Sequence, residues 1–444
     1  MPEKKVSHVR WVLVFLLFLL SAVAFLDRVN ISIAGSSIAE AYGLSNVQLG
    51  YVFSAFLAGY ALFQTVGGRL ADQLGSRRVL AGGVLWWGVF TALGAAVPTG
   101  VGHAVLLFAT IRFLLGAGEA VVYPASNQFV AQWIPLQERG TANGIIFAGV
   151  GAGAGLTPPL ITYVMLDFGW RASFYVCAAV GVIAGSIWFL AARDTPEQHP
   201  RISGSELDHI RKGLTQSIRS DVSNLVSPKA TLVPWTRVLQ SKDVWAVTIS
   251  YFCYGYAAWI FFSWFYIYLA KVRGLDLKAS AVYGTLPFLA MALACPLGGI
   301  LSDRITKSSG ARLGRCGVAG ISIGLAAIFL ALGSQVASAR IASLVLAGGA
   351  GALYLSQSSF WSVTAGLAGS SSGSVSGFMN MGAQFGGMLT ASLTPAIAAH
   401  FGWTASFLVA AALCALGAVL WFAVNPHNCL TTSVGSTRVE QVRS

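Results

Sequence analysis

Long apolar runs separated by short polar segments dominate the chain, and this pattern predicts membrane-spanning helices. A run of about 20 apolar residues is long enough to cross the hydrocarbon core of a bilayer as an α-helix. The first run follows Lys4, Lys5 and Arg10 as in a secretory signal peptide, but it stays apolar as far as Ala34, which is too long for a signal segment. We therefore predict twelve spans, at residues 11–35, 47–67, 79–98, 103–126, 141–165, 172–192, 243–270, 280–302, 317–334, 340–362, 374–399 and 404–424.

The positions of Lys and Arg predict how these spans are oriented. An even number of spans places both termini on one side of the membrane. With a cytoplasmic N-terminus, the cytoplasmic segments hold 21 of the 28 Lys and Arg residues, and the segments on the other side hold five. Basic residues concentrate in the cytoplasmic loops of membrane proteins. We therefore predict a multi-pass membrane protein with both termini in the cytoplasm.

The composition supports a lipid environment and excludes several other classes of protein. Hydrophobic residues make up 55% of the 444 residues and charged residues only 10%, and the mean hydropathy is +0.69. A soluble domain carries about 25% charged residues. A soluble enzyme, a nucleic-acid-binding protein and a disordered chain are therefore excluded. The six cysteines are scattered singly, so we predict neither a disulfide framework nor a metal site, and we expect no cofactor.

The two halves of the sequence repeat each other. FGWRASF at 168–174 returns as FGWTASF at 401–407, and GGRLAD at 67–72 returns as GGILSD at 298–303. The two offsets nearly agree, which favours an internal duplication over chance recurrence. We predict an all-α membrane protein of two parallel six-helix halves, with a binding site at their interface near the membrane midplane. The predicted parts are an N-terminal bundle (1–192), a cytoplasmic linker (193–242) that is partly helical near 206–215, a C-terminal bundle (243–424) and a cytoplasmic tail (425–444).

The loop after the second span carries the ordered motif G-x-L-x-D-x-x-G-x-R-R at residues 68–78. Glycine allows helices to approach closely, and an aspartate can accept hydrogen bonds from the N-terminus of a neighbouring helix or from arginine. The alternative is that these residues only orient the chain as a basic cytoplasmic loop. We predict a conformational latch that consists of Gly68, Asp72, Gly75, Arg77 and Arg78, with Asp303 as the counterpart in the second half.

This loop and its repeat resemble the signature of the major facilitator superfamily. RFLLGAGEAVVYP at 112–124 is similar to the fourth-helix pattern of that superfamily, R-x-x-x-G-x-G-x-A-x-x-x-P. FLDRVNIS at 25–32, GEA at 118–120, DTPEQHP at 194–200 and VPW at 233–235 resemble the anion:cation symporter family, which includes bacterial galactonate, glucarate and hexuronate transporters and animal sialin. The resemblance implies the major facilitator fold and a secondary active transporter that imports an organic anion, such as a hexonate or hexarate, with protons. It also implies a location in a bacterial inner (plasma) membrane.

Four charged side chains lie deep within the predicted spans, namely Asp27, Arg28, Arg112 and Glu119. A charge at the bilayer centre costs about 2.5–3.5 kcal/mol on insertion scales, so we expect these residues to be functional. Arg112 and Glu119 are seven residues apart and share one helix face. Because arginine stays protonated and binds carboxylates in a bidentate manner, Arg28 and Arg112 are predicted to bind the substrate, and Asp27 and Glu119 to carry protons. A purely structural set of ion pairs is the alternative.

The charges of these four residues suggest how protons and an anion are coupled. They cancel when both acids are ionised. Protonation of either acid leaves a net positive cavity, which attracts an anion. We therefore expect the anion and the proton to bind together.

The resemblance implies four further substrate-binding residues, namely Tyr60, Ser358, Trp361 and Asn380, with Gln357 and Gln384 nearby. Packing is the alternative role of Tyr60 and Trp361, and a helix–helix hydrogen bond is that of Asn380. Phe25 stands where a sugar-acid transporter would offer a polar group, and the seventh span is rich in aromatic residues. An aromatic or otherwise less hydroxylated carboxylate is therefore the alternative substrate.

The sequence also argues against other functions. It lacks the H-E-x-x-H and G-x-S-x-G patterns of common hydrolases, so we expect no enzyme and no catalytic residues. It also lacks the P-loop pattern that ATP-driven transport requires. The duplicated latch argues against a passive channel, whereas antiport and sodium coupling stay open. The expected partners are a small organic anion, protons and the lipid bilayer, without nucleic acid, and we expect a monomer.

Overall fold

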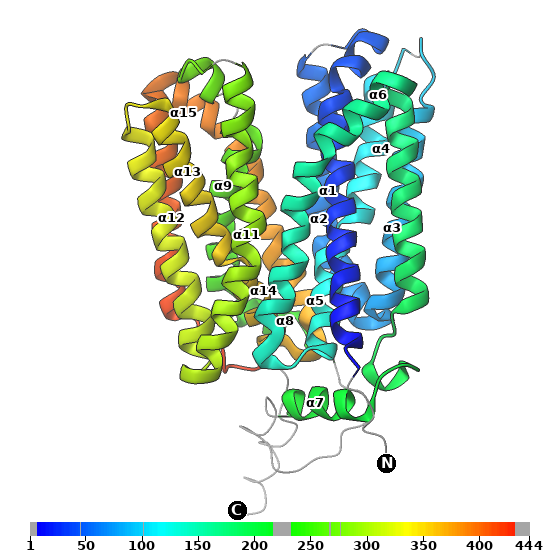
Figure 1. Cartoon of the computed structure of the whole chain (residues 1–444), viewed down its shortest axis with the longest axis vertical. Coiled ribbons are helices and arrows are strands. Elements are labelled where there is room, and N and C mark those ends of the chain that lie inside the picture. The colour runs from blue at the N-terminus through cyan, green and yellow to red at the C-terminus, as the bar shows by residue number, and fades with distance from the viewer. Residues whose placement is uncertain are drawn as a thin grey trace, which may run out of the picture.

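The computed structural model describes residues 7–44, 46–100, 102–215, 232–265, 268–275 and 277–430, which form helices and the turns between them (Figure 1). The N-terminal helices are α1 (Val9–Tyr42), α2 (Asn46–Leu74), α3 (Ser76–Ala96), α4 (Ala104–Glu119), α5 (Val122–Trp133) and α6 (Arg139–Ala191), with the short turn η1 (Leu136–Glu138) before α6. The C-terminal helices are α9 (Lys242–Ser263), α11 (Leu277–Ser309), α12 (Val318–Gln335), α13 (Ala339–Leu355), α14 (Gln357–Ala368) and α15 (Ser372–Ala423), with the short turns η3 (Tyr268–Val272), η4 (Arg312–Gly317) and η5 (Gly369–Ser371). The all-α prediction is confirmed for the described residues.

Helices α6 and α15 each consist of two helices joined at a glycine. Gly169 in α6 has a φ of 79° and Gly402 in α15 has a φ of 83°. A residue with a Cβ rarely adopts these left-handed values, so glycine is the residue that fits both joints. Both glycines belong to the repeated Phe-Gly-Trp segment. The repeat found in the sequence thus marks equivalent joints in the two halves.

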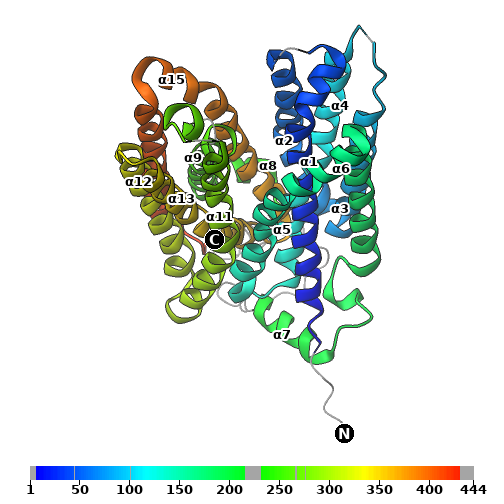
Figure 2. The ribbon, with the colours of Figure 1, turned by 45° about the horizontal axis from the view of Figure 1, so that its top comes forward.

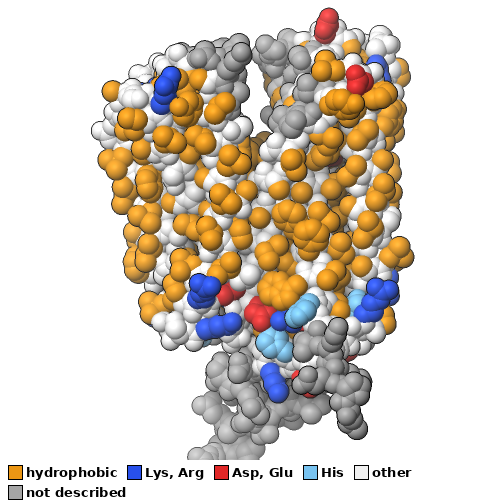
Figure 3. Space-filling model, in the orientation of Figure 1, with side chains coloured by type: hydrophobic (Ala, Val, Ile, Leu, Met, Phe, Trp, Pro, Cys, Tyr) orange, Lys and Arg blue, Asp and Glu red, His pale blue; other side chains and the backbone are white. Residues whose placement is uncertain are grey.

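The outer surface of the bundle is apolar, as a lipid-facing surface must be. Figure 3 shows hydrophobic side chains along the height of the bundle, with most of the basic side chains visible on that face near the end that carries α7. Large apolar side chains such as Leu166 and Phe422 are each 80% exposed. Nine segments of the described residues are long and apolar enough to cross a membrane. The number of twelve spans stays a prediction.

The helices form two groups, which we call the N half (α1–α6) and the C half (α9–α15); they stand side by side in Figures 1 and 2. Within the N half α1 packs on α6 and α2 on α4, and within the C half α9 and α12 pack on α15. Across the interface α2 packs on α15 and α6 on α11. Close approach depends on glycine, because a Cβ on Gly68 or Gly299 would collide with the backbone of the other half. The N half ends and the C half begins close to the predicted residues. The division of the chain into bundles, linker and tail stays a prediction.

The linker between the halves contains the turn η2 (Pro196–Gln198), α7 (Gly204–Thr215) and α8 (Trp235–Gln240). Of these, α7 docks beneath the N half, at the end that we call the α7 end (lower in Figure 1). The helix predicted near 206–215 is therefore confirmed as α7. Glu206 of α7 is fully buried and accepts hydrogen bonds from the backbone N–H groups of Val9 (3.0 Å) and Arg10 (3.2 Å) at the start of α1. Residues 216–231 of the predicted linker and 431–444 of the predicted tail lie outside the described residues.

Candidate functional site

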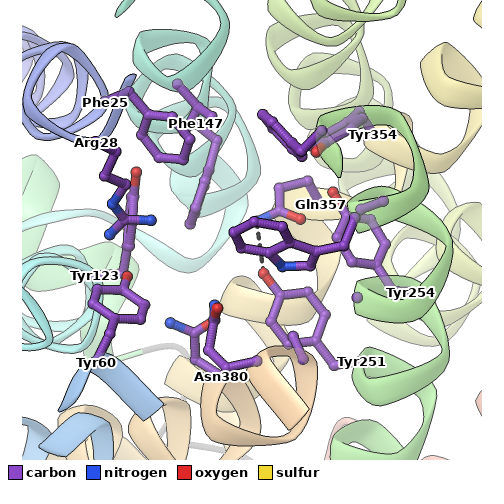
Figure 4. Close-up of a pocket in the computed structure, with 17 residues that line it drawn as sticks. Phe25, Arg28, Tyr60, Tyr123, Phe147, Tyr251, Tyr254, Tyr354, Gln357 and Asn380 are labelled. Carbon is purple, nitrogen blue, oxygen red and sulfur yellow. Dashed lines mark hydrogen bonds between the residues drawn. The ribbon is translucent and has the colours of Figure 1, made fainter. Parts of the chain in front are cut away.

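A cavity of about 90 Å³ lies between the two halves (Figure 4). A water molecule takes up about 30 Å³ in the liquid, so the cavity is small in this conformation. Figure 4 shows Arg28 and Tyr60 on the side of the N half, facing Tyr254 and Gln357 on the side of the C half. The lining residues are Phe25, Arg28, Tyr60, Tyr123, Phe147, Val150, Tyr251, Tyr254, Gly255, Ala258, Trp259, Phe262, Tyr354, Gln357, Asn380, Ala383 and Gln384.

Arg28 is the charged residue of this lining. Its Nε donates a hydrogen bond of 2.5 Å to Oε1 of Glu119 on α4. The guanidinium also lies over the rings of Tyr60, at 4.2 Å, and Phe25, at 4.6 Å. Aromatic faces attract cations, so these rings hold the guanidinium at the wall of the cavity. Arg28 is therefore positioned to meet an anion while it is engaged by Glu119.

The other three deeply placed charges lie behind this wall. Asp27, Arg112 and Glu119 are 3%, 4% and 0% exposed, and none of them lines the cavity. Asp27 accepts a hydrogen bond of 2.6 Å from the hydroxyl of Thr91 on α3. The guanidinium of Arg112 lies over the ring of Phe56 at 4.6 Å.

Several polar atoms of this group have no hydrogen-bond partner among the described residues. They are Oδ1 of Asp27, one amino nitrogen of Arg28, two nitrogens of Arg112 and Oε2 of Glu119. Unpaired buried polar groups are costly. The group therefore has spare donors and acceptors in this conformation, which a proton, a water or an anion can use.

The C half contributes aromatic rings and amides to the cavity, without charge. The hydroxyl of Tyr251 accepts hydrogen bonds from Gln357 Nε2 at 2.8 Å and from Trp361 Nε1 at 3.2 Å. Asn380 reaches across to the N half and donates to Oε1 of Gln64 at 2.9 Å. Figure 4 shows Asn380 at the lower side of the cavity in that view.

The structure places the predicted substrate-binding residues unevenly. Arg28, Tyr60 and Asn380 line the cavity, whereas Arg112, Ser358 and Trp361 do not. Ser358 is fully buried and its hydroxyl has no partner among the described residues. Trp361 packs behind the wall, with its ring 5.0 Å from that of Phe147.

Among the aromatic residues of the wall, sequence reasoning missed three, namely Tyr123, Phe147 and Tyr354. Tyr123 follows Glu119 by four residues, at the break between α4 and α5, and this proximity was the one available signal. Phe147 and Tyr354 carry no comparable signal, because aromatic residues are common in the packed interiors of helical bundles.

The predicted latch aspartates both bind across the interface at the α7 end. Asp72 of the N half accepts hydrogen bonds from the backbone N–H groups of Gly373 (2.9 Å) and Ser374 (2.8 Å) at the start of α15, and from the Ser374 hydroxyl. Asp303 of the C half accepts them from the N–H groups of Gly140 (3.0 Å) and Thr141 (2.6 Å) at the start of α6. The start of a helix carries unpaired N–H groups and a partial positive charge, which a carboxylate satisfies.

The other predicted latch residues have different surroundings. Gly68 lies against Gly373 of the C half, where a Cβ would collide with the backbone. Gly75 has a φ of 88° and leads into α3. Arg77 stays within its own half, because its Nε donates to the Phe189 carbonyl at 2.8 Å. Arg78, next to it, also lies in the first turn of α3.

Hydrogen bonds between the two halves are therefore distributed unevenly along the interface. Among the described residues, the hydrogen bonds between the halves run from Gln64–Asn380, at the cavity, down to the α7 end. On the other side of the cavity the halves meet through the rings of Phe25 and Phe262, whose centroids are 6.2 Å apart. Figure 3 shows a hollow between the halves at that end. The α7 end is closed in this structure.

The comparisons with known proteins agree with this architecture. The Major Facilitator Superfamily matches residues 17–387. A probable sulfoacetate transporter of Cupriavidus necator is 34% identical over 423 residues, which cover 95% of this chain and 94% of that protein. A probable galactarate/D-glucarate transporter of Bacillus subtilis is 33% identical over 308 residues, which cover 69% of this chain and 67% of that protein. The chain belongs to the Major Facilitator Superfamily and, within it, to a family of anion transporters.

A solved structure shows the same fold at low sequence identity. The proton:xylose symporter of this superfamily superimposes with a TM-score of 0.72 at 14% identity, and the match covers 95% of this chain and 97% of that one. The resemblance read from the sequence motifs is thus confirmed. The protein is a multi-pass membrane transporter, and both relatives reported above are named as probable transporters of organic anions.

Proposed function

We propose that this protein imports a small organic anion together with protons by alternating access, with its α7 end in the cytoplasm. One observation carries the proposal: the charged residue of the cavity wall, Arg28, is already bound to Glu119. An incoming anion must compete with the Glu119 carboxylate for this cation. Protonation of Glu119 removes that competitor. Proton binding and anion binding therefore favour each other.

The charges behind the wall support the same reading. The four side chains Asp27, Arg28, Arg112 and Glu119 sum to zero when both acids are ionised. An anion would then enter a buried site without net charge, which is unfavourable in a region of low dielectric constant. One bound proton makes the site net positive and compensates for the anion. Asp27 is the second candidate proton carrier, because it is buried and its Oδ1 has no hydrogen-bond partner among the described residues.

The cavity wall can hold an anion at Arg28 and select its remaining part. The free amino nitrogen of Arg28 is an available donor at the wall. Amides of Gln357, Gln384 and Asn380 offer donors and acceptors on the opposite side. The aromatic rings between them exclude water, which strengthens the contact between the charged groups.

Size favours a short anion as the substrate. A cavity of about 90 Å³ suits a compact carboxylate or sulfonate better than a six-carbon diacid in this conformation. A relative that covers 95% of the chain is named for sulfoacetate, a two-carbon anion. We therefore place a short carboxylate or sulfonate first. A sugar acid is the second candidate, supported by the amides of the wall and by the galactarate/D-glucarate relative. An uptake competition panel of sulfoacetate, glucarate, galactonate and benzoate ranks these classes.

The decisive experiment uses Glu119→Gln in proteoliposomes. Gln imitates the protonated acid, so Arg28 becomes permanently available. The variant should still exchange labelled for unlabelled anion, because exchange never requires the proton to leave. Net accumulation driven by an inward proton gradient should fail. In the parent, uptake should rise as the external pH falls and should stop with a protonophore.

The control is Glu40→Gln, which neutralises an exposed carboxylate on the same helix as Arg28. It should accumulate substrate like the parent. Concentrative uptake by Glu119→Gln at the parental level would reject Glu119 as the proton carrier and leave Asp27 in that role. Uptake driven equally well by sodium at constant pH would reject proton coupling.

A further inference from the structure

A second cavity, of about 250 Å³, lies at the α7 end and plays no part in the transport path described above. Its walls come from three places: the segment around η1 in the N half, helix α7 of the linker, and the end of α11 in the C half. The lining residues are Pro135, Gln137, Glu138, His209, Lys212, Gly213 and Lys307. The cavity is therefore polar, and its lining includes three residues that can carry a positive charge.

The acid in this lining, Glu138, already binds two basic side chains. Glu138 binds Nε of Arg10 at 3.0 Å and Nε2 of His209 at 2.8 Å. Arg10 in turn binds the buried Glu206 at 3.1 Å. Lys212 and Lys307 form no ion pair with any acid among the described residues. Two lysine charges thus remain uncompensated around a cavity that is roomy enough for a hydrated ion.

The two lysines belong to different halves of the transporter. Lys212 lies on α7, which is fixed to the N half by the contacts of Glu206 with α1 and by the packing of Gly213 against Pro135. Lys307 lies on α11 of the C half, four residues after the latch residue Asp303. Asp303 caps α6 within three residues of Glu138. The walls of this cavity therefore come together through the same contacts that close the α7 end.

We propose that this cavity is a regulatory site for a phosphate-type dianion on the cytoplasmic side, which binds Lys212 and Lys307 together and holds the α7 end closed. Lysines bind phosphate groups as point charges, and two of them suit a compact dianion. A ligand that binds one conformation stabilises that conformation. A dianion in this site therefore slows the opening of the transporter towards the cytoplasm. The inference rests on the proposed cytoplasmic orientation of the α7 end.

The chemistry fits two sources of the phosphate group, namely inorganic phosphate and the headgroup of phosphatidic acid. The first experiment measures binding alone. The purified full chain is heated with inorganic phosphate, or with chloride at equal ionic strength, and the midpoint of unfolding is compared. Phosphate should raise the midpoint in the parent, and Lys307→Gln should abolish the rise. Arg304→Gln is the matched control, because Arg304 is exposed on the same helix but does not line the cavity.

The second experiment measures transport. Phosphatidylcholine vesicles are loaded with phosphate or chloride, and a third set contains phosphatidic acid in the bilayer. Internal phosphate should slow initial uptake several-fold in the parent and in Arg304→Gln, but not in Lys307→Gln or Lys212→Gln. Slowing that occurs with phosphatidic acid alone, and that is lost in the same two variants, identifies the lipid as the source.

Two results would overturn the site. One is the absence of any effect of either phosphate source on the parent. The other is an effect that survives unchanged in Lys307→Gln, which would place the ligand elsewhere, for instance in the central cavity. Because the unfolding experiment needs no transport substrate, it tests this site even if the proposed function fails. Conversely, a failed phosphate test leaves proton-coupled anion import standing.

Discussion

The two halves share a helix order and a Phe-Gly-Trp joint, yet they furnish the central cavity with different chemistry. The N half supplies the four deeply placed charges, Asp27, Arg28, Arg112 and Glu119. The wall of the C half is aromatic and amide-bearing, as in the cluster of Tyr251, Gln357 and Trp361. A duplicated fold has therefore kept its backbone plan while its two copies took on different side chains.

We therefore expect the two halves to have different roles in transport. Charge compensation between a proton and an anion can occur within the N half alone, because both acids and both arginines are there. The C half then sets the shape and the hydrogen bonding of the site. Substitutions in the N half should change how uptake depends on pH, and substitutions in the C half should change which anion is accepted.

The largest effect is expected for Arg28→Lys. Lysine keeps the charge but loses the planar fork and its stacking on Tyr60 and Phe25. The lost charge-assisted hydrogen bonds contribute about 2 kcal/mol to binding, so the apparent affinity should fall roughly 30-fold. Competition uptake measures this change.

Arg112→Lys is the comparison for that variant, since Arg112 lies behind the wall. It should alter the pH profile more than the affinity. A greater loss of affinity in Arg112→Lys than in Arg28→Lys would contradict the assignment of Arg28 as the anion ligand.

The second effect concerns the caps that join the halves. Asp72→Asn and Asp303→Asn each remove the negative charge and one of two acceptor oxygens at a helix start, at a cost of about 0.3–2 kcal/mol. Asp303→Asn should have the larger effect, because Asp303 also binds Arg315 at 2.6 Å. Both variants should open the α7 end more often.

Maleimide labelling measures this opening, with a cysteine introduced at Thr364 in a Cys429→Ser background. Thr364 is buried and receives a hydrogen bond from Asn127 of the other half. Asp208→Asn, on the exposed face of α7, serves as the control. If labelling at 364 is the same in Asp303→Asn and in the control, the caps do not hold the halves together.

A smaller effect is expected in the wall of the C half. Tyr251→Phe removes a hydroxyl that accepts from both Gln357 and Trp361. Losing this hydroxyl should cost about 1 kcal/mol of binding free energy in total, so affinity should fall about fivefold and the ranking of competing anions should change. The pH profile should keep its shape. A shifted pH profile with an unchanged ranking of anions would contradict this assignment of roles to the two halves.

The smallest effect is expected for Ser358→Ala. The Ser358 hydroxyl lies outside the cavity wall and has no partner among the described residues. Removing an unsatisfied buried hydroxyl is nearly neutral. Uptake kinetics should stay within about twofold of the parent. A tenfold loss would show instead that Ser358 reaches the substrate in another conformation, as its position in the resembled transporters implies.

Much of this architecture could be predicted from the sequence, because the signals are local. Apolar length predicts the helices, the repeated segment predicts the joints at Gly169 and Gly402, and burial in lipid makes Asp27 and Glu119 conspicuous. Helical spacing also places Arg112 and Glu119 on one face. This spacing cannot show that Arg28 lines the cavity and that Arg112 does not, because the lining depends on how α1 and α4 are rotated relative to each other.

Contacts between distant segments account for what the sequence did not reveal. The cap that Glu206 provides for α1 joins residues almost 200 positions apart, and no local pattern indicates it. The cavity beside Lys307 needs α7, η1 and α11 to meet, so it too emerges only from tertiary packing. Arg77 shows the reverse case, since a motif residue expected in the latch serves its own half.

The crossed aspartate caps obey a two-fold relation. Asp72 of the N half binds the helix start at Gly373, and Asp303 of the C half binds the equivalent start at Gly140. In a closed symmetric dimer, a first site on each copy binds a second site on the other copy. Such a contact is called isologous. A single six-helix unit with one such aspartate and one such helix start would satisfy both caps by pairing with its own copy. The chain thus has a symmetric, dimer-like contact where its halves close, and it departs from symmetry at the central cavity, where we propose that the proton and the anion bind.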